Sequence, residues 1–278
     1  MPKEIILPIG DNQPNKNNEG SLFFIGNATL LIRYAGFTIL TDPTFIHMHQ
    51  KVDLGYGLKA KRLTNPAAEI KDLPKIDLII LSHFHGDHFD QVAVKELDKS
   101  LPIVTTNHSA KELHKRGFTN IQKLGKWESI SFVKGNSKLS ITSTPGRHGP
   151  LPISILMPNV MGSILDFQDS PQRMFRIYIT GDTLVYNQII EISKRFKDVN
   201  LALLHLGGTR IMGILVTMDA EQGTRMLNII NPKIAIPIHY NDYDVFKSPI
   251  EDFKNEVKKI GLEGRVKYLS HGDTYTFG

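Results

Sequence analysis

Cysteine is absent from this chain of 278 residues. Disulfide bonds, thiolate metal ligands and a cysteine nucleophile are therefore excluded. Long apolar runs are absent as well. The best one, residues 153–165, is interrupted by Pro158 and Gly162 and is shorter than the roughly 20 residues that a membrane-spanning helix needs. The first 20 residues do not place a basic segment before an apolar one, as a secretory signal does. We therefore expect a cytoplasmic protein without a membrane span.

The chain also has little excess charge of either sign. It carries 33 Lys and Arg against 28 Asp and Glu, a net charge of +5, and its densest basic group is only Lys59, Lys61 and Arg62. Scattered charges of this kind are typical of a solvated surface, so a nucleic-acid partner is not expected. The small positive balance slightly favours an anionic small-molecule substrate.

The composition is that of a globular protein, with 41% hydrophobic and 22% charged residues. The length fits one large α/β domain, and neither a long linker nor an internal repeat interrupts it. Residues 11–20 are polar and rich in turn formers. We therefore expect a single domain over residues 1–278, with residues 1–20 as a loosely ordered lead-in.

Hydrophobic periodicity predicts a series of strands and helices. Residues 35 and 36 are expected to form a tight turn, residues 168–172 a second turn, and residues 153–165 a core strand plus a loop, with a lipid-facing lip as the alternative. The expected strands are 21–25, 28–34, 37–41, 76–81, 130–132, 139–143, 161–166, 175–180, 201–205 and 234–238. The expected helices are 90–97, 109–116, 188–195, 220–229 and 250–260. This order predicts a layered α/β domain in which one sheet packs on another inside helices.

The clearest chemical signal is SHFHGDH at residues 82–88, directly after the apolar run 76–81. His83, His85, Asp87 and His88 lie within six positions at the end of a buried strand, so their side chains can surround one small volume. Imidazole nitrogens suit Zn, Fe and Mn, and a carboxylate adds negative charge. Gly86 allows the backbone between the ligands to turn tightly. A chance cluster in a solvated turn is the alternative, and the spacing makes it the weaker one.

The motif His83-x-His85-x-Asp87-His88 resembles that of the metallo-β-lactamase fold hydrolases, and the resemblance extends from about residue 20 to residue 278. It implies a four-layer αβ/βα sandwich of two mixed β-sheets flanked by helices. Residues 216–221 (VTMDAE) and 237–240 (PIHY) make the chain most similar to bacterial proteins of the ascorbate-6-phosphate lactonase and N-acylphosphatidylethanolamine phospholipase D-like groups. Thr217 stands where the phospholipase-like members carry a His, so the resemblance does not extend to their substrate.

The resemblance implies two divalent metal ions. One would be held by His83, His85 and His148, the other by Asp87, His88 and His239, with Asp182 between them. Residues 82–89 are here called the metal loop, and Asp42 would support this loop on the side away from the metals. Zn is the first expectation, with Mn or Fe as alternatives. Two metals can lower the pKa of a bridging water from about 16 to near neutrality, which makes hydroxide available at pH 7.

Three of these residues have ordinary alternatives when each is considered alone. His148 could be a simple loop residue, Asp182 could cap a turn or a helix, and His239 could be a hydrogen-bonded core histidine. Their positions at successive expected strand ends favour the joint interpretation as ligands.

Asp87, itself a ligand in this scheme, and His205 are the candidate catalytic residues. His205 ends the apolar run 201–204 and resembles a proton donor in the tRNA 3′-processing members, although Leu206 replaces their acidic neighbour. It could act as general acid for the leaving group. It could equally be a structural histidine beside the site.

Arg147, Arg210 and Tyr240 adjoin expected site residues and are candidates for binding an anionic group or an oxyanion. Each could instead form a surface ion pair or hydrogen bond. His47 and His49 alternate like a second ligand pair, but a loop over the mouth of the site is the favoured interpretation.

The sequence thus predicts a metal-dependent hydrolase that cleaves an ester, lactone or phosphodiester bond in a small, anionic substrate. A nuclease or phosphodiesterase acting on RNA is one alternative, against which stand Leu206 and the lack of a long basic arm. A non-catalytic metal-binding regulatory module is the other, and such proteins commonly lose ligands that are present here. A homo-oligomer is plausible on general grounds.

Overall fold

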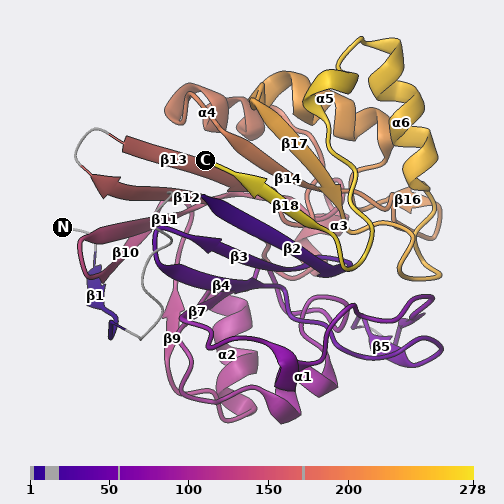
Figure 1. The fold of residues 1–278 in the computed structure, drawn as a ribbon. Coiled ribbons are helices and arrows are strands. Elements are labelled where there is room, and N and C mark those ends of the chain that lie inside the picture. Colours follow the sequence, from indigo (N-terminus) through magenta and orange to yellow (C-terminus); the bar gives the residue numbers. More distant parts are fainter. Residues whose placement is uncertain (1–2, 10–18, 56, 171–172) are drawn as a thin grey trace.

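The computed structural model describes residues 3–9, 19–55, 57–170 and 173–278. In this part of the chain two seven-stranded sheets face each other (Figure 1). The first sheet has the order β18 (Thr274–Phe277), β2 (Gly20–Gly26), β3 (Thr29–Tyr34), β4 (Phe37–Thr41), β7 (Leu78–Ile80), β8 (Ile103–Thr105) and β9 (Ile121–Lys123). The second has the order β1 (Lys3–Ile6), β10 (Ser129–Lys134), β11 (Ser137–Pro145), β12 (Met161–Ser170), β13 (Arg173–Ile179), β14 (Leu201–His205) and β17 (Ile234–Ile238).

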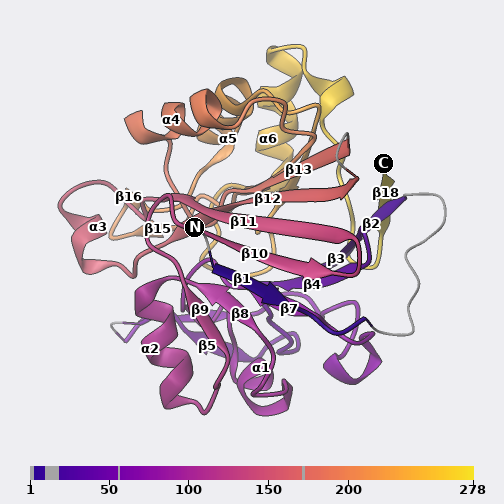
Figure 2. The same cartoon turned by 90° about the vertical axis from the view of Figure 1, so that its left-hand side faces the viewer.

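Helices cover the outer faces of both sheets (Figures 1 and 2). Helices α1 (Gln91–Glu96) and α2 (Asn107–Lys115) lie on the first sheet, and α4 (Asn187–Arg195), α5 (Ala220–Ile230) and α6 (Ile250–Lys259) lie on the second. The remaining elements are short: α3 (Ile153–Leu156), the 3₁₀ helices η1 (Ile70–Asp72) and η2 (Glu263–Arg265), and the hairpins β5 (Lys51–Asp53)–β6 (Lys59–Lys61) and β15 (Arg210–Ile211)–β16 (Ile214–Leu215). The predicted four-layer αβ/βα sandwich is confirmed.

Both sheets are mixed, and their parallel halves position the site. Strands β4, β7, β8 and β9 run parallel to one another in the first sheet, as do β13, β14 and β17 in the second. The carboxyl ends of parallel strands meet at one edge of a sheet. The loops that follow these strands are therefore brought together, which matters for the polar residues found there.

Local sequence explains several element boundaries. Asp90 begins α1 by accepting a hydrogen bond from the Ala93 amide, and Asp219 begins α5 in the same way through Gln222. Between β3 and β4, Ala35 and Gly36 both have positive φ, 51° and 82°. Two left-handed residues in a two-residue loop form the turn that matches the twist of a hairpin. The turn predicted at residues 35 and 36 is therefore confirmed.

An apolar layer between the two sheets forms the central core. Its aromatic part joins the sheets directly, since the Phe167 ring of β12 lies 5.3 Å from Tyr34 and 6.2 Å from Phe37 between ring centroids. Two further clusters of buried side chains lie under α4–α6 and under α1–α2. In the parallel halves, the residues of β7 and β14 are buried on both faces, as the continuous apolar run before residue 82 predicted.

The structure departs from the predicted elements where strands are short or lie at edges. Residues 3–6 of the predicted lead-in form β1, which pairs in parallel with β10, whereas residues 10–18 lie outside the described residues. Residues 168–170 continue β12 rather than forming a turn, and residues 171 and 172 are not among those described. Three-residue strands such as β8 and β9 carry too little periodicity to be recognised in isolation.

Residues 153–165 also differ from the prediction. Only the part from Met161 onward is a core strand, whereas residues 153–156 form α3, in which no residue is buried. Ile155 is 74% exposed and the neighbouring Leu151 66%. Among the described residues, no helix has both the length and the apolar character needed to cross a membrane.

The ring contacts between the sheets lead to a stability prediction. Phe167→Ala should lower the free energy of unfolding by about 3–5 kcal/mol, because it leaves a cavity where two sheets meet. Met174→Ala, at a half-exposed position of β13, should change it by less than about 0.5 kcal/mol. Urea unfolding of metal-free protein, followed by circular dichroism, measures both changes. Equal effects of the two substitutions would contradict the importance of this contact.

Candidate metal centre

The polar residues singled out from the sequence follow strands of both sheets. Residues 83–88 follow β7, and Asp42 follows β4 in the same sheet. In the second sheet, each of four strands contributes one residue at or just after its end: His148 after β11, Asp182 after β13, His205 in β14 and His239 after β17. All of them are buried, with at most 7% of their surface exposed. Two sheets that pack face to face thus enclose one group of imidazoles and carboxylates.

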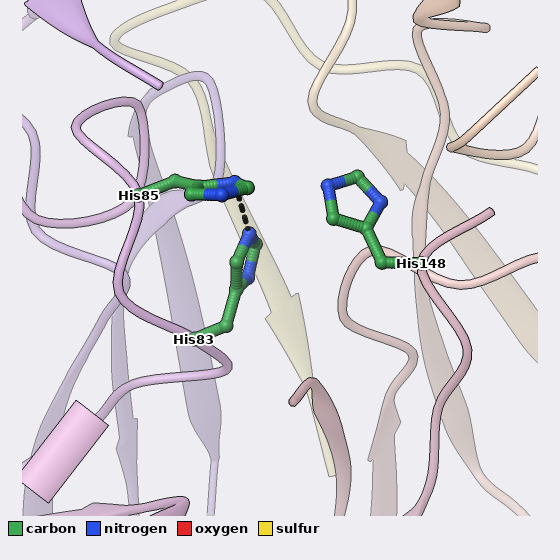
Figure 3. A group of neighbouring side chains, drawn as sticks. All are labelled: His83, His85 and His148. Atoms are coloured by element: carbon green, nitrogen blue, oxygen red, sulfur yellow. Dashed lines mark hydrogen bonds between the residues drawn. The ribbon is translucent and has the colours of Figure 1, made fainter. Parts of the chain in front are cut away.

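His83, His85 and His148 form the first group (Figure 3). Nε2 of His83 lies 3.0 Å from Nδ1 of His85, and the His148 ring faces them from the other sheet. One nitrogen from each ring lies within 4.8 Å of the others. Three imidazoles that present nitrogens to one point are a ligand set typical of Zn and related metals.

The second group consists of Asp87, His88 and His239, with Asp182 beside it. Nε2 of His239 is 3.5 Å from Oδ2 of Asp87, and Nε2 of His88 is 3.3 Å from Oδ2 of Asp182. Asp182 also forms a group with His83 and His88. Its carboxylate therefore faces both groups, as the sequence analysis expected of a shared ligand.

Hydrogen bonds to the backbone hold two of the rings in place. Nδ1 of His148 donates to the Val216 carbonyl at 2.8 Å, and Nδ1 of His239 lies 3.1 Å from the Leu206 carbonyl. A proton on Nδ1 leaves the lone pair on Nε2, which is the nitrogen directed into the site. Such partners fix both the tautomer and the orientation of a ligating imidazole.

The electrostatic environment differs between the two groups. Burial lowers the pKa of His83 and His148, and brings the pKa of His85 to about 3. These three rings are therefore neutral at pH 7, with lone pairs free to bind a metal. Burial also opposes charge on His88, but Asp182, Asp87 and Asp42 outweigh it and raise its pKa.

Carboxylates in the second group stay ionised for the complementary reason. Burial alone would raise the pKa of Asp182, yet His239 and His88 lower it well below its ordinary value. The pKa of Asp87 is lowered in the same way by His88 and His239 against the effect of burial. Negative charge is thus available where a divalent cation would need it.

The donor atoms themselves test whether a metal fits. Five of them are buried and lack a hydrogen-bond partner among the described residues: His85 Nε2, Asp87 Oδ1, His88 Nε2, Asp182 Oδ1 and His239 Nε2. Burying polar atoms without partners is costly, and native proteins rarely leave several together. Coordination by cations would satisfy such atoms, so this donor set fits a pair of divalent metals.

The comparisons with known proteins agree with this geometry. The family described as "Beta-lactamase superfamily domain" matches residues 38–240, a span that contains every residue of both groups. The chain belongs to the β-lactamase superfamily.

Individual relatives of this superfamily member are similar over nearly their whole length. A UPF0173 metal-dependent hydrolase of Caldivirga maquilingensis is 25% identical over 260 residues, covering 91% of this chain and 96% of the relative. The isothiocyanate hydrolase from Delia radicum gut bacteria has a TM-score of 0.78 at 24% identity, covering 92% of this chain and 98% of that one. A metallo hydrolase from Ignicoccus hospitalis has a TM-score of 0.68 at 22% identity, with 94% and 99% covered.

Behind the candidate ligands of this β-lactamase superfamily member, Asp42 and His205 form a buried layer. Asp42 accepts the Ser82 amide at 2.7 Å, and its Oδ2 lies 3.4 Å from Nδ1 of His88. The same oxygen is 3.3 Å from Nε2 of His205, whose Nδ1 lies 3.3 Å from the Thr180 hydroxyl. Both ring nitrogens of His205 therefore have protein partners.

Asn27, which the sequence analysis did not single out, joins ligands from both sheets. Its side-chain amide donates to the Asp87 carbonyl at 2.6 Å, and its own carbonyl accepts the His239 amide at 2.8 Å. Asn27 has a left-handed φ of 53° and His239 one of 60°. Left-handed conformations are uncommon for residues other than glycine, and cluster at functional sites. The Gly26-Asn27 pair between two strands is the one local signal that could have drawn attention to this position.

Gly86 is needed for a reason other than the one predicted. Its φ is not in the left-handed region, so the turn itself does not require glycine. A Cβ atom at this position would lie only 2.6 Å from the Asp53 carbonyl oxygen of β5. The absent side chain therefore lets the β5–β6 hairpin pack directly against the metal loop.

The residues predicted to contact substrate have partners within the protein. The Arg147 guanidinium lies over the Tyr186 ring, 4.4 Å from its centroid, and Arg210 is 3.7 Å from Asp219. Tyr240 donates its hydroxyl to the Leu269 carbonyl. His47 pairs with Glu69 on the surface, and neither it nor the exposed His49 joins a metal-binding group of the described residues.

Thr217 lies beside one of the candidate metal ligands. It is fully buried, and its hydroxyl lies 3.3 Å from Oδ2 of Asp182. The hydroxyl thus takes part in orienting the carboxylate that faces both groups.

This contact generates a prediction about metal affinity. Thr217→Val keeps the shape of the side chain but removes the donor, so Zn²⁺ affinity should fall about 10- to 100-fold, as for other partners of metal ligands. Thr217→Ser keeps the hydroxyl and should stay within about threefold of the wild type. Competition titrations with a chromophoric chelator measure both variants. Unchanged affinity in Thr217→Val would show that the hydroxyl does not orient Asp182.

Proposed function

We propose that this chain is a metal-dependent hydrolase with two divalent ions. One ion would be held by His83, His85 and His148, and the other by Asp87, His88 and His239 with Asp182 shared. The observation that carries the proposal is the convergence of these donors at the edge of the sandwich, where five of their atoms lack hydrogen-bond partners in the described residues. The relatives named as metal-dependent hydrolases support it.

When bound, such a metal pair supplies a Lewis acid and brings the pKa of a water molecule near neutrality. Among metals, an all-nitrogen and oxygen donor set fits Zn first, and Mn or Fe as alternatives. The bond cleaved would be an ester, a lactone or a phosphodiester in a small molecule, since each offers an electrophilic centre to hydroxide. The ligands alone do not select among these bonds, because specificity resides in the surrounding loops.

In this function the protein sets the protonation state and the orientation of the side chains that would bind the metals. The neutral imidazoles of His83, His85 and His148 and the ionised carboxylates need no change of protonation at pH 7 before they bind cations, whereas His88 and His239, whose pKa values are raised, would each release a proton. Asp42 fixes the Ser82 amide and the His88 ring. His205, held between Asp42 and Thr180, would position Asp42 rather than protonate a leaving group, because neither of its nitrogens is free.

The two arginines differ in the support they give to the anionic substrate first expected. Arg210 pairs with Asp219, whereas Arg147 stacks on Tyr186 and its buried Nε has no hydrogen-bond partner among the described residues. An anionic phosphodiester remains within the proposal because the metals themselves would neutralise its charge.

Metal content and activity test the proposal together. Protein purified without chelator should contain about two metal ions per chain, and Asp182→Ala clearly fewer. The control is Asp252→Ala, at an exposed residue in the first turn of α6, which should retain the wild-type content. Elemental analysis measures all three proteins.

The same samples should then be assayed with p-nitrophenyl acetate, bis(p-nitrophenyl) phosphate and γ-butyrolactone. Hydrolysis of at least one should disappear on chelation and return with added Zn²⁺ or Mn²⁺. Fewer than about one metal per chain after reloading would rule out the dinuclear site. A fully loaded protein that is inactive on a broad panel of esters, lactones and phosphodiesters would favour a regulatory metal-binding module.

A further inference from the structure

A cleft of about 740 Å³ opens beside the candidate metal centre. Its floor includes Phe84, His85 and Phe89 of the metal loop, and one wall is formed by residues of α1 and α2. The opposite wall is residues 155–159, from the end of α3 onward, here called the α3 wall. Figure 2 shows α3 and α2 as neighbours on the same side of the molecule. The volume lies within the range of clefts that bind small molecules.

The α3 wall is exposed, but the loop that contains it is anchored at both ends beside the metal centre. It belongs to the loop between β11 and β12, which also carries His148. At one end of this loop, His148 is held by the Val216 carbonyl, and at the other the Met161 amide donates to the Ser82 carbonyl. Both ends of the loop that contains the wall are therefore anchored beside the candidate metal centre, and His85 belongs to both the centre and the cleft.

The chemistry of the cleft is apolar near the metal ligand. Phe84 and Phe89 are stacked with their centroids 5.8 Å apart, and Ile155 and Met157 line the same cleft. Ile155 exposes 74% of its surface, which is high for a large aliphatic side chain. Apolar side chains that line a concave site next to reacting groups are typical of ligand pockets.

Three charged side chains that line the cleft, Arg116, Glu112 and Asp90, have partners within the protein. Nη1 of Arg116 is 2.8 Å from Oε2 of Glu112, and its guanidinium lies 4.4 Å above the Phe84 ring. Asp90 accepts the amides of Phe45 and Ile46. The cleft thus offers no uncompensated Arg to an anionic group.

We propose that this cleft binds an uncharged apolar group of the substrate, an alkyl or aryl chain attached to the bond that is cleaved at the metals. The inference rests on the proposed hydrolase function and narrows its substrate class. Because His85 borders both regions, a substrate whose reacting carbonyl or phosphoryl group lies at the metals directs its remaining part along the α3 wall.

Two assays test this inference with the metal-loaded protein. The first measures kcat/KM for p-nitrophenyl acetate, butyrate and octanoate. The value should rise by about tenfold or more from acetate to octanoate, since every methylene transferred from water into an apolar site contributes to binding. Ile155→Ser should reduce the octanoate value about fivefold or more, and the acetate value by a clearly smaller factor.

The matched control is Ile190→Ser, an equal change at another exposed helical isoleucine, which lies on α4 outside the cleft. It should leave the whole ester series unaltered. A flat chain-length profile, or equal losses in the two variants, would overturn the inference while leaving the hydrolase proposal intact.

The second assay separates binding from catalysis. The neutral apolar fluorophore N-phenyl-1-naphthylamine should bind to the wild type and to Ile190→Ser, and several-fold more weakly to Ile155→Ser. If none of the three esters is hydrolysed, the ester-hydrolase part of the proposed function fails. This titration still decides whether the cleft is an apolar binding site. Absence of binding, or identical binding by all three proteins, would overturn the inference.

Discussion

The removal of ionisable side chains from water at one edge of the sandwich is the constraint on which the rest of the structure depends. Buried there are six histidines and three aspartates: His83, His85, His88, His148, His205, His239, Asp42, Asp87 and Asp182. An isolated charge in such a place would be very unfavourable. The arrangement is tolerable because carboxylates and imidazoles alternate in space, and because the remaining donor atoms suit cations. Much of the surrounding hydrogen bonding fixes the positions of these side chains relative to one another.

Two kinds of hydrogen-bond partner fix these positions. Backbone carbonyls of Val216 and Leu206 orient His148 and His239, while the Asp42 carboxylate contacts Ser82, His88 and His205. The former are set by the course of the chain and are insensitive to side-chain identity. The latter form a connected network in which the loss of one group would leave another buried without a partner. The metal loop is thus held both from the side and from behind.

The sequence could predict the fold because its strands and helices carry strong periodicity, and because SHFHGDH concentrates four donors in seven positions. Strands 201–205 and 234–238 match the structure at both ends. The distant ligands His148, Asp182 and His239 have no such local signal and depended on resemblance. Asn27 and Thr217 escaped attention since their roles arise from contacts with residues far away along the chain, to Asp87 and Asp182. Edge strands such as β1 are specified by their partners rather than by their own pattern.

The hydrogen bonds of Asn27 to distant residues have a consequence for the order in which the chain folds. The meanders β2–β4 and β10–β13 are each built from neighbouring segments, so they can form early. By contrast, Asn27 bonds Asp87 across 60 residues, and its partner Asp242 is 215 residues away. Contacts that close such long loops form only after their entropic cost is offset by other interactions. The first half of the chain, whether nascent or cleaved, contains the donors of residues 83–88 but lacks His148, Asp182 and His239. The complete set of donors therefore exists only in a chain whose two sheets have already packed together.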